Sequence, residues 1–242
     1  MAIENKYSRI VIKLTGESFG GEKRTLIDHT AVSHIAHGIK TLLEDTGVQL
    51  AIVNGGGNLY RGRDHKDSSM VDPAQLDYIG MLSTIMNALA LQHELRALSV
   101  ETRVMSSLRT DQACEPYIRL RAIHFLEKGY PVIFAGGTGS PFFTTDSAAA
   151  FKAGEINAKA VLKATNVDGI FDSDPKQNPD AKQFSTITFS QALSQNLTVM
   201  DGTAFAYCQA RKIPIIVFNA NDFGNVARIV RGEKIGTLVT PD

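Results

Sequence analysis

The sequence predicts an α/β fold with a mostly parallel sheet and helices on both faces. Short apolar runs rich in Val and Ile recur along the chain, beginning with RIVIKL at residues 9–14, and such runs are typical of strands buried on both faces. Longer amphipathic stretches separate these runs, and strands that alternate with helices form βαβ units. Glycines directly follow several runs, as in NGGGN at residues 54–58. Ligands of open α/β sheets bind beyond such strand ends.

The first 160 residues account for most of the expected elements. A helix over residues 28–47 ends at Gly47, a common stop signal. A longer helix over residues 73–99 begins with Pro73, and proline is favoured in the first helical turn. The remaining expected elements of this part are strands at 9–14, 48–54, 100–106 and 130–136 and helices at 117–129 and 146–156.

The alternation continues after residue 157 but is interrupted once. Strands are expected at residues 158–165 and 213–219, and a helix at residues 223–232. Residues 168–188 between them are rich in Asp, Pro, Asn and Lys, which indicates a loop or hairpin excursion. The sequence therefore predicts a single domain over residues 1–242, divided into an N-terminal lobe to about residue 160 and a C-terminal lobe from about residue 161.

The composition excludes several classes of protein. Lys and Arg together number 25, as do Asp and Glu, so direct DNA binding is not expected. No apolar run reaches the roughly 18 residues of a membrane span, and the N-terminus has no signal-peptide core. Cys114 and Cys208 show no metal-type spacing and are expected to be reduced thiols. The expected protein is soluble and cytoplasmic, with no membrane partner.

Charged residues and glycines gather at the ends of two expected strands. Lys13 lies in the first strand, where an unpaired charge is unfavourable, and Thr15 and Gly16 follow it. Gly55–Gly57 follow the second strand, with Arg61 close behind, and three glycines let backbone N–H groups approach an anion. The plainer alternatives are a lysine that snorkels at a sheet edge and a flexible turn. Together, these features favour a phosphate site.

The stretch GGTGSPFFTTDSAAA, residues 136–150, leads from an expected strand into an expected helix. Thr144 or Thr145 can cap that helix, and the N-terminal amides of a helix attract anions. Capping alone explains one threonine and Asp146. It leaves the three glycines of GGTG unexplained, so this turn is also a candidate for anion binding.

A further candidate is LKATNVDGIFDSDP, residues 162–175, in which Lys163 ends a strand. Phe171 lies between polar turns, as an adenine slot requires, although a solvated acidic hairpin is the alternative. The chain contains neither a P-loop signature nor a complete dinucleotide signature, and the acidic cluster lacks the glycine and glutamate of a calcium loop. The sequence thus predicts a phosphate-handling protein that is not a P-loop NTPase.

Six motifs, in their order and spacing, resemble those of bacterial uridylate kinases of the amino acid kinase superfamily. They are KLTGES, VNGGGNLYRG, LDYIGMLSTIMNALAL, GGTGSPFFTTDSAAA, LKATNVDGIFDSDP and VMDGTAF. The resemblance implies a three-layer αβα sandwich and transfer of the γ-phosphoryl group from ATP to UMP, giving UDP and ADP. It also implies Mg²⁺ carried by ATP without a dedicated protein cage, and a homohexamer that GTP activates and UTP inhibits.

The resemblance also implies roles for individual residues. The catalytic set would be Lys13, Arg61, Asp146 and Asp201. ATP would contact Lys13, Leu14, Thr15, Gly16, Gly57, Arg61, Lys163, Thr165, Phe171 and Asp174. UMP would contact Gly56, Asp77, Thr138, Gly139, Ser140, Pro141, Phe142, Phe143, Thr144 and Thr145. Pro141 and the two phenylalanines would form an apolar wall, and Arg103 fits an effector position.

Two alternatives stay open from the sequence. One is another amino acid kinase, acting on carbamate, acetylglutamate or isopentenyl phosphate. The motifs GSPFFTTDSA and LDYIGML argue against it, because the relatives of those activities lack them. The other is a nucleotide-sensing regulator without catalysis, which the complete set of lysines and carboxylates disfavours.

Overall fold

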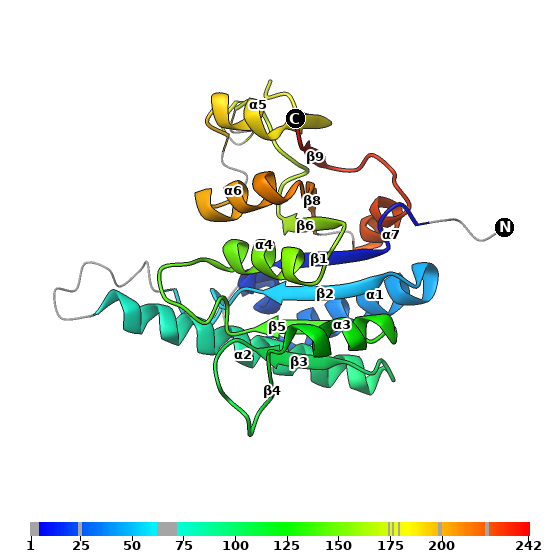
Figure 1. The fold of residues 1–242 in the computed structure, drawn as a ribbon, viewed down its shortest axis with the longest axis vertical. Helices are drawn as coiled ribbons and strands as arrows, with labels where there is room; N and C mark the ends of the chain where they lie inside the picture. The colour runs from blue at the N-terminus through cyan, green and yellow to red at the C-terminus, as the bar shows by residue number, and fades with distance from the viewer. Residues whose placement is uncertain are drawn as a thin grey trace.

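A nine-stranded sheet forms the centre of the molecule (Figure 1). The computed structural model describes residues 5–23, 26–61, 72–173, 175, 177–178, 180–197, 200–220 and 223–242. The strands are β1 Arg9–Leu14, β2 Gln49–Asn54, β3 Arg103–Ser106, β4 Glu115–Pro116, β5 Val132–Ala135, β6 Ala160–Thr165, β7 Thr186–Thr188, β8 Ile215–Asn219 and β9 Thr237–Thr240. Their order is β4-β3-β5-β2-β1-β6-β8-β9-β7, and all neighbouring strands are parallel except β8 and β9.

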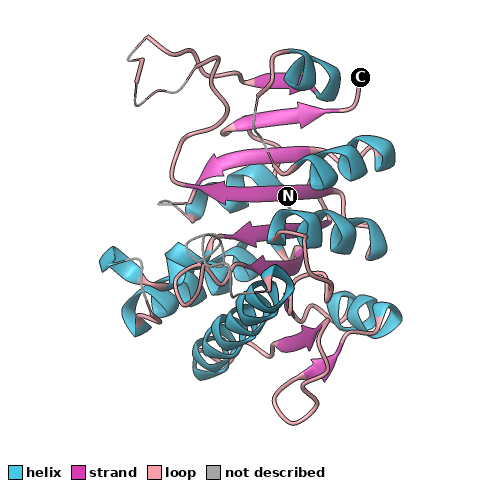
Figure 2. Ribbon diagram, turned by 90° about the vertical axis from the view of Figure 1, so that its left-hand side faces the viewer, coloured by secondary structure: helices cyan, strands magenta, loops and turns pink. Residues whose placement is uncertain are grey.

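Helices cover both faces of this sheet, which confirms the predicted αβα layers (Figure 2). The helices α1 His29–Thr46, α2 Pro73–Ala97 and α7 Gly224–Val230 pack on one face, and α3 Arg119–Glu127, α4 Thr145–Glu155, α5 Phe189–Ser194 and α6 Gly202–Arg211 on the other. Side chains of β1 alternate between the layers: Ile10 and Ile12 join the first core and Val11 the second. Two short 3₁₀ helices, η1 Gly16–Phe19 and η2 Gly21–Lys23, follow β1.

The predicted excursion at residues 168–188 is a hairpin that ends in a strand. Phe171 and Gln183 form an isolated antiparallel bridge, and β7 follows. The elements without a prediction are β4, η1, η2, β7, α5, α6 and β9. Each strand among them has at most four residues, too few to show a clear period. Such short strands depend on pairing with neighbours that are distant in sequence.

A glycine between α7 and β9 allows the C-terminal strand to pair with β8. Gly236 has φ of +72°, and a Cβ built on it would lie 2.1 Å from the carbonyl oxygen of Val217. Gly47 has φ of +60° but no atom within 4 Å of its Cβ position. We expect Gly236→Ala to reduce the free energy of unfolding by about 3 kcal/mol and Gly47→Ala by only about 1 kcal/mol. Urea titration of both variants measures this difference, and equal losses would contradict the steric argument.

Candidate active site

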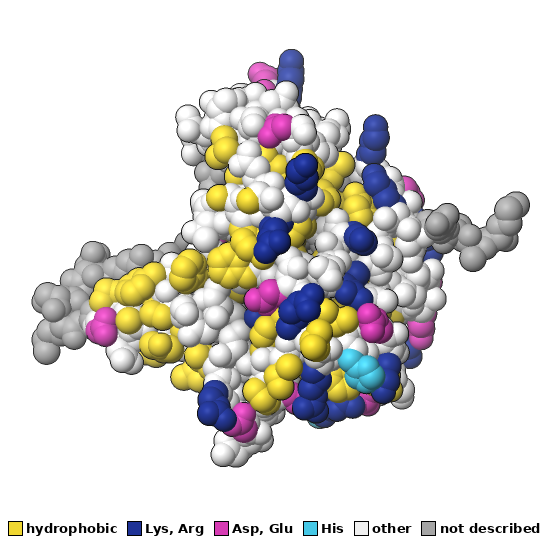
Figure 3. All heavy atoms as spheres, viewed as in Figure 1, with side chains coloured by type: hydrophobic (Ala, Val, Ile, Leu, Met, Phe, Trp, Pro, Cys, Tyr) yellow, Lys and Arg dark blue, Asp and Glu magenta, His cyan; other side chains and the backbone are white. Residues whose placement is uncertain are grey.

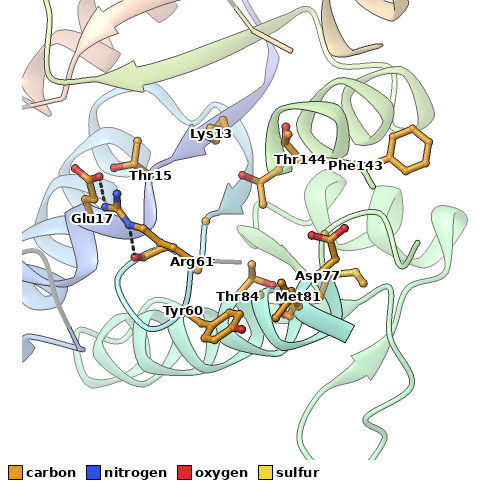
Figure 4. Close-up of a pocket in the computed structure, with 18 residues that line it drawn as sticks. Lys13, Thr15, Glu17, Tyr60, Arg61, Asp77, Met81, Thr84, Phe143 and Thr144 are labelled. Carbon is orange, nitrogen blue, oxygen red and sulfur yellow. Dashed lines mark hydrogen bonds and ion pairs between the residues drawn. The ribbon is translucent and has the colours of Figure 1, made fainter. Parts of the chain in front are cut away.

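Two cavities lie at the carboxyl ends of the parallel strands. The first has a volume of about 400 Å³ and lies beyond β1, β2 and β5 (Figure 4). Its lining consists of Lys13, Thr15, Gly16, Glu17, Gly55, Gly56, Gly57, Tyr60, Arg61, Leu76, Asp77, Gly80, Met81, Thr84, Gly137, Phe143, Thr144 and Thr145. The second has a volume of about 580 Å³ and is lined by Lys163, Thr165, Val167, Gly169, Ile170, Phe171, Asp172, Ser173, Pro175, Asn196, Leu197 and Val217.

A buried carboxylate between two lysines connects the cavities. Lys13 lines the first cavity and Lys163 the second, and the two residues are direct neighbours in the pairing of β1 with β6. Asp146 is only 8% exposed. Its Oδ1 lies 3.0 Å from Nζ of Lys13, and its Oδ2 accepts a hydrogen bond of 2.7 Å from Nζ of Lys163. The structure thus brings Lys13 together with two residues that lie more than a hundred positions further along the sequence.

The two lysines also control the ionisation of Asp146. Burial by itself would raise the pKa of this carboxyl, but the charges and hydrogen bonds of Lys13 and Lys163 outweigh burial and hold the pKa below its ordinary value of 3.8. Asp146 is therefore a carboxylate at neutral pH, and both of its oxygens face ammonium groups.

This pKa shift makes a prediction about stability. A carboxyl whose folded-state pKa is lowered stabilises the fold above its unfolded-state value, and that stabilisation disappears as the pH falls through the folded-state pKa. We expect the difference in unfolding free energy between the parent protein and Asp146→Asn to be full above pH 3.8 and to shrink below it. Urea titrations from pH 7 to pH 3 measure this difference, and one that stays constant over that range would contradict the shift.

Asp201 fixes the start of α4, which carries Asp146. As N-cap of α6, Asp201 accepts from the backbone N–H of Ala204 at 2.9 Å. It also accepts from Oγ of Ser147 at 2.8 Å and from the hydroxyl of Thr144, the N-cap of α4. One carboxylate thereby ties two helix N-termini together. Asp201 lines neither cavity, so its geometry is that of a positioning residue.

Close backbone contacts require the glycines after β1 and β2. A Cβ on Gly16 would lie 2.4 Å from the backbone nitrogen of Gly57, and one on Gly55 would lie 2.7 Å from the nitrogen of Gly16. A Cβ on Gly56 would lie 2.7 Å from the carbonyl oxygen of Gly80 in α2. Three backbone segments therefore meet at the floor of the first cavity, and a side chain at any of these positions would push them apart.

Buried amides of α2 hold this floor in place. Asn87 donates to the carbonyl oxygen of Gly55 at 2.8 Å and exchanges hydrogen bonds of 2.7 and 3.0 Å with Asn58. The hydroxyl of Thr84 accepts from the backbone N–H of Gly136 at 2.8 Å. The loops after β2 and β5 are thus fixed to one helix. The sequence did not predict a role for Thr84 or Asn87, although polar residues within an apolar helix are a signal of buried hydrogen bonding.

Asp77 lies across the first cavity on α2 and anchors the loop before α4. Its Oδ2 accepts from the backbone N–H of Phe142 at 2.7 Å. Phe142 has φ of +69°, a left-handed conformation that is unfavourable for a residue with a side chain. Its side chain is 73% exposed and does not line the cavity, whereas Phe143 does. Of the two phenylalanines, only Phe143 forms part of the cavity wall in this structure, and the contact of Phe142 with UMP stays a prediction.

The other predicted contacts divide between the cavities. Besides Lys13, four residues that were predicted to contact ATP lie in the first cavity together with Asp77: Thr15, Gly16, Gly57 and Arg61. The predicted ATP contacts Lys163, Thr165 and Phe171 lie in the second. The predicted catalytic and substrate-binding residues that line neither cavity are Leu14, Thr138, Gly139, Ser140, Pro141, Phe142, Asp146 and Asp201. Asp174 lies outside the described residues.

Comparisons with known proteins identify the family of the chain. The model of the "Amino acid kinase family" matches residues 8–219. The chain belongs to the amino acid kinase family. A chloroplastic uridylate kinase of Arabidopsis thaliana, named PUMPKIN, is 47% identical over 234 residues, which are 97% of this chain and 69% of the relative.

Two solved structures of UMP kinases share the fold. The enzyme of Bacillus anthracis superposes with a TM-score of 0.93 at 39% identity, covering 98% of this chain and 97% of the other. The enzyme of Ureaplasma parvum gives a TM-score of 0.89 at 38% identity, covering 97% and 99%. These findings confirm the resemblance to uridylate kinases.

Arg103, the expected effector residue of this amino acid kinase, lies away from both cavities. It opens β3, at the opposite edge of the sheet from the strand ends. Its guanidinium pairs with Glu101 at 3.0 Å and lies 4.8 Å from the ring centre of Phe125. Any effect of this residue on the cavities must therefore be indirect.

The carboxylates around the first cavity are already engaged by protein groups. Glu17 pairs with Arg61, Asp77 accepts from Phe142, and Asp146 faces the two lysines. Within the described ranges, no group of three or more His, Cys, Asp or Glu side chains is arranged to hold a metal ion. Over the same ranges, no helix has the length and apolar character needed to cross a bilayer.

Proposed function

We propose that this chain is a UMP kinase that transfers the γ-phosphoryl group of ATP to UMP. One observation carries the proposal: the Lys13–Asp146–Lys163 cluster lies where two nucleotide-sized cavities meet. The first cavity would hold UMP, since Asp77 and Thr145 line it, and the second would hold ATP beside Phe171. The uridylate kinase relatives support this choice of substrates.

In the proposed reaction, an oxygen of the UMP phosphate attacks the γ-phosphorus of ATP. A new P–O bond forms, the bond from the γ-phosphorus to the bridging oxygen breaks, and ADP leaves with that electron pair. The attacking phosphate is already an anion, so the reaction does not need a strong general base. Lys13 and Lys163 would neutralise the charge that spreads over the transferring group.

Asp146 would organise these lysines and would not accept a proton. Its oxygens both face ammonium groups, and the lowered pKa makes it a weak base. Asp201 would act one step further out by fixing the start of α4.

Mg²⁺ would enter with ATP, as expected from the family. Because the described carboxylates around the first cavity already have protein partners, the residues present fit a metal ion held mainly by phosphate oxygens. When bound, Mg²⁺ supplies additional neutralisation of phosphate charge.

An acceptor panel tests the proposed function. ADP release is measured with ATP, Mg²⁺ and one of UMP, CMP, AMP, carbamate or acetylglutamate. We expect turnover that is specific for UMP, with UDP as the second product. Turnover only with carbamate or a carboxylate would identify another amino acid kinase activity. Binding of UTP or GTP without any UDP formation would identify a sensor.

The proposal includes a homohexamer that GTP activates and UTP inhibits. It also includes a cytoplasmic location and the division of the chain into a UMP lobe and an ATP lobe. Large apolar side chains at helical spacing support self-association: Ile79, Leu82 and Met86 of α2 are all exposed. Figure 3 shows hydrophobic side chains gathered at the end of the molecule where α2 begins. Light scattering coupled to gel filtration measures the assembly, and a monomer at micromolar concentration would contradict it.

A further inference from the structure

Glu17 and Arg61 form an ion pair on the wall of the first cavity, and the mechanism above gives Glu17 no role (Figure 4). Glu17 lies in the first turn of η1, directly after β1, whereas Arg61 ends the described part of the glycine loop after β2. The two residues are 44 positions apart in sequence. An acidic side chain at a site for an anionic substrate is electrostatically unfavourable unless it serves a partner.

The backbone around Glu17 fixes where its side chain begins. The N–H of Gly20 donates to the carbonyl oxygen of Glu17 at 3.0 Å, and the hydroxyl groups of Thr15 and Ser18 are 2.9 Å apart. Gly16 is packed so closely against Gly57 that a Cβ would lie 2.4 Å from its nitrogen. The η1 turn and the glycine loop are therefore held together, with Glu17 opposite Arg61.

The contacts of Arg61 leave one edge of its guanidinium for a ligand. Its Nε donates to the carbonyl oxygen of Gly57 at 2.9 Å, and its Nη2 donates to Oε1 of Glu17. Among the described residues, none accepts a hydrogen bond from Nη1. A guanidinium binds a phosphate with two parallel N–H groups, and its end-on pair, Nη1 and Nη2, still has a hydrogen for each bond.

An Arg61 side chain that Glu17 already holds in place before the substrate arrives favours phosphate binding. A free arginine side chain loses rotamer freedom when it grips a ligand, and that loss weakens binding. The side chains of Glu17 and Arg61 are 35% and 29% exposed, so their attraction is moderated by water and leaves the charge of Arg61 available.

We propose that Glu17 is a positioning residue that orients Arg61 for the phosphate group of the acceptor substrate. This inference rests on the proposed function, because it takes the first cavity to bind a phosphomonoester. In the opposite role, Glu17 would compete with the substrate phosphate for Arg61, and the substrate would have to displace its carboxylate. The two roles predict opposite changes in the KM for UMP when the charge of Glu17 is removed.

The test is a double-mutant cycle of Glu17→Gln and Arg61→Ala, measured as KM and kcat for UMP. Glu17→Gln keeps the size of the side chain and removes its charge. We expect it to raise KM about tenfold with a smaller change in kcat, and to change KM less than twofold in the Arg61→Ala background. Glu22→Gln, on the neighbouring η2, is the matched control for charge, since Glu22 is exposed and lines neither cavity, and it should change nothing.

Two results would overturn the proposal. A lower KM in Glu17→Gln would identify a competitor, and equal effects in both backgrounds would identify a general structural role. Binding of inorganic phosphate is followed by ³¹P NMR for the parent, the two single variants and the double variant. These titrations measure the coupling between Glu17 and Arg61 without any nucleotide. If the parent does not phosphorylate UMP but the phosphate titrations show coupling, the proposed function fails and the role of Glu17 stands. If UMP is phosphorylated and no coupling appears in either measurement, only the role of Glu17 fails.

Discussion

Replacing Asp146 by asparagine will lower kcat by about a hundredfold or more, because the two lysines at the meeting point of the cavities lose their common partner. Asp146 contacts Lys13 at 3.0 Å and Lys163 at 2.7 Å, so its charge both holds and separates the ammonium groups. An asparagine keeps the shape but not the charge. Misplaced lysines no longer match the charge distribution of the transition state, and loss of one preorganised group typically reduces the rate by about 10²–10³-fold.

The same substitution will also destabilise the fold, by about 3 kcal/mol at neutral pH, since it removes the carboxylate that two partly buried ammonium groups face. Glu44→Gln is a suitable control because Glu44 forms an exposed pair with Lys40 on α1, at 3.8 Å, where the expected change is below about 0.5 kcal/mol. Steady-state kinetics at several Mg²⁺ concentrations and urea titration measure both effects. A near-normal kcat with an unchanged dependence on Mg²⁺ would show that Asp146 does not organise the two lysines for catalysis.

Replacing Arg61 by alanine will reduce kcat/KM by about 30-fold to 1,000-fold, which corresponds to about 2–4 kcal/mol of transition-state stabilisation. Arg61 lies on the wall of the first cavity, where Glu17 and the carbonyl oxygen of Gly57 hold its guanidinium (Figure 4). Arg61→Lys should recover only part of the activity, because an ammonium cannot form the two parallel hydrogen bonds of a guanidinium.

Arg228→Ala is the matched control for Arg61→Ala. Arg228 pairs with Glu233 at 2.8 Å near the surface of α7 and lines neither of the two cavities. It should leave kcat/KM within about twofold of the parent. An Arg61→Ala enzyme that retains most of its kcat/KM would show that the guanidinium does not contact the transferring or accepting phosphate.

The sequence was sufficient to predict the central strands because they are buried on both faces. The middle of RIVIKL and the apolar segment of β8 are buried on both faces, and only a sheet covered by helices on both sides accommodates them. The strands β7 and β9 were not predicted, since three or four residues show no period and become strands only through pairing, β7 with β9 and β9 also with β8. The helix α6 was missed because Asp201 was interpreted as a catalytic residue and not as an N-cap.

The site was predicted as a set of motifs, but not as a geometry. Lys13 and Lys163 become neighbours only through the pairing of β1 with β6, and Asp146 reaches both only because α4 starts beside that pair. No role was predicted for Glu17 of the motif KLTGES, since its partner Arg61 is 44 positions away in the sequence. Motif spacing indicates which residues matter, whereas strand register determines which of them meet.

The most direct test of this account is a crystal structure with UMP and a non-hydrolysable ATP analogue bound together. We expect UMP in the first cavity, with its phosphate on Arg61 and its nucleoside near Asp77, and the ATP base in the second cavity beside Phe171. The γ-phosphate analogue should then lie between Lys13 and Lys163. Nucleotides bound with these cavities exchanged, or a γ-phosphate remote from both lysines, would contradict the central claim that this cluster is the point of phosphoryl transfer.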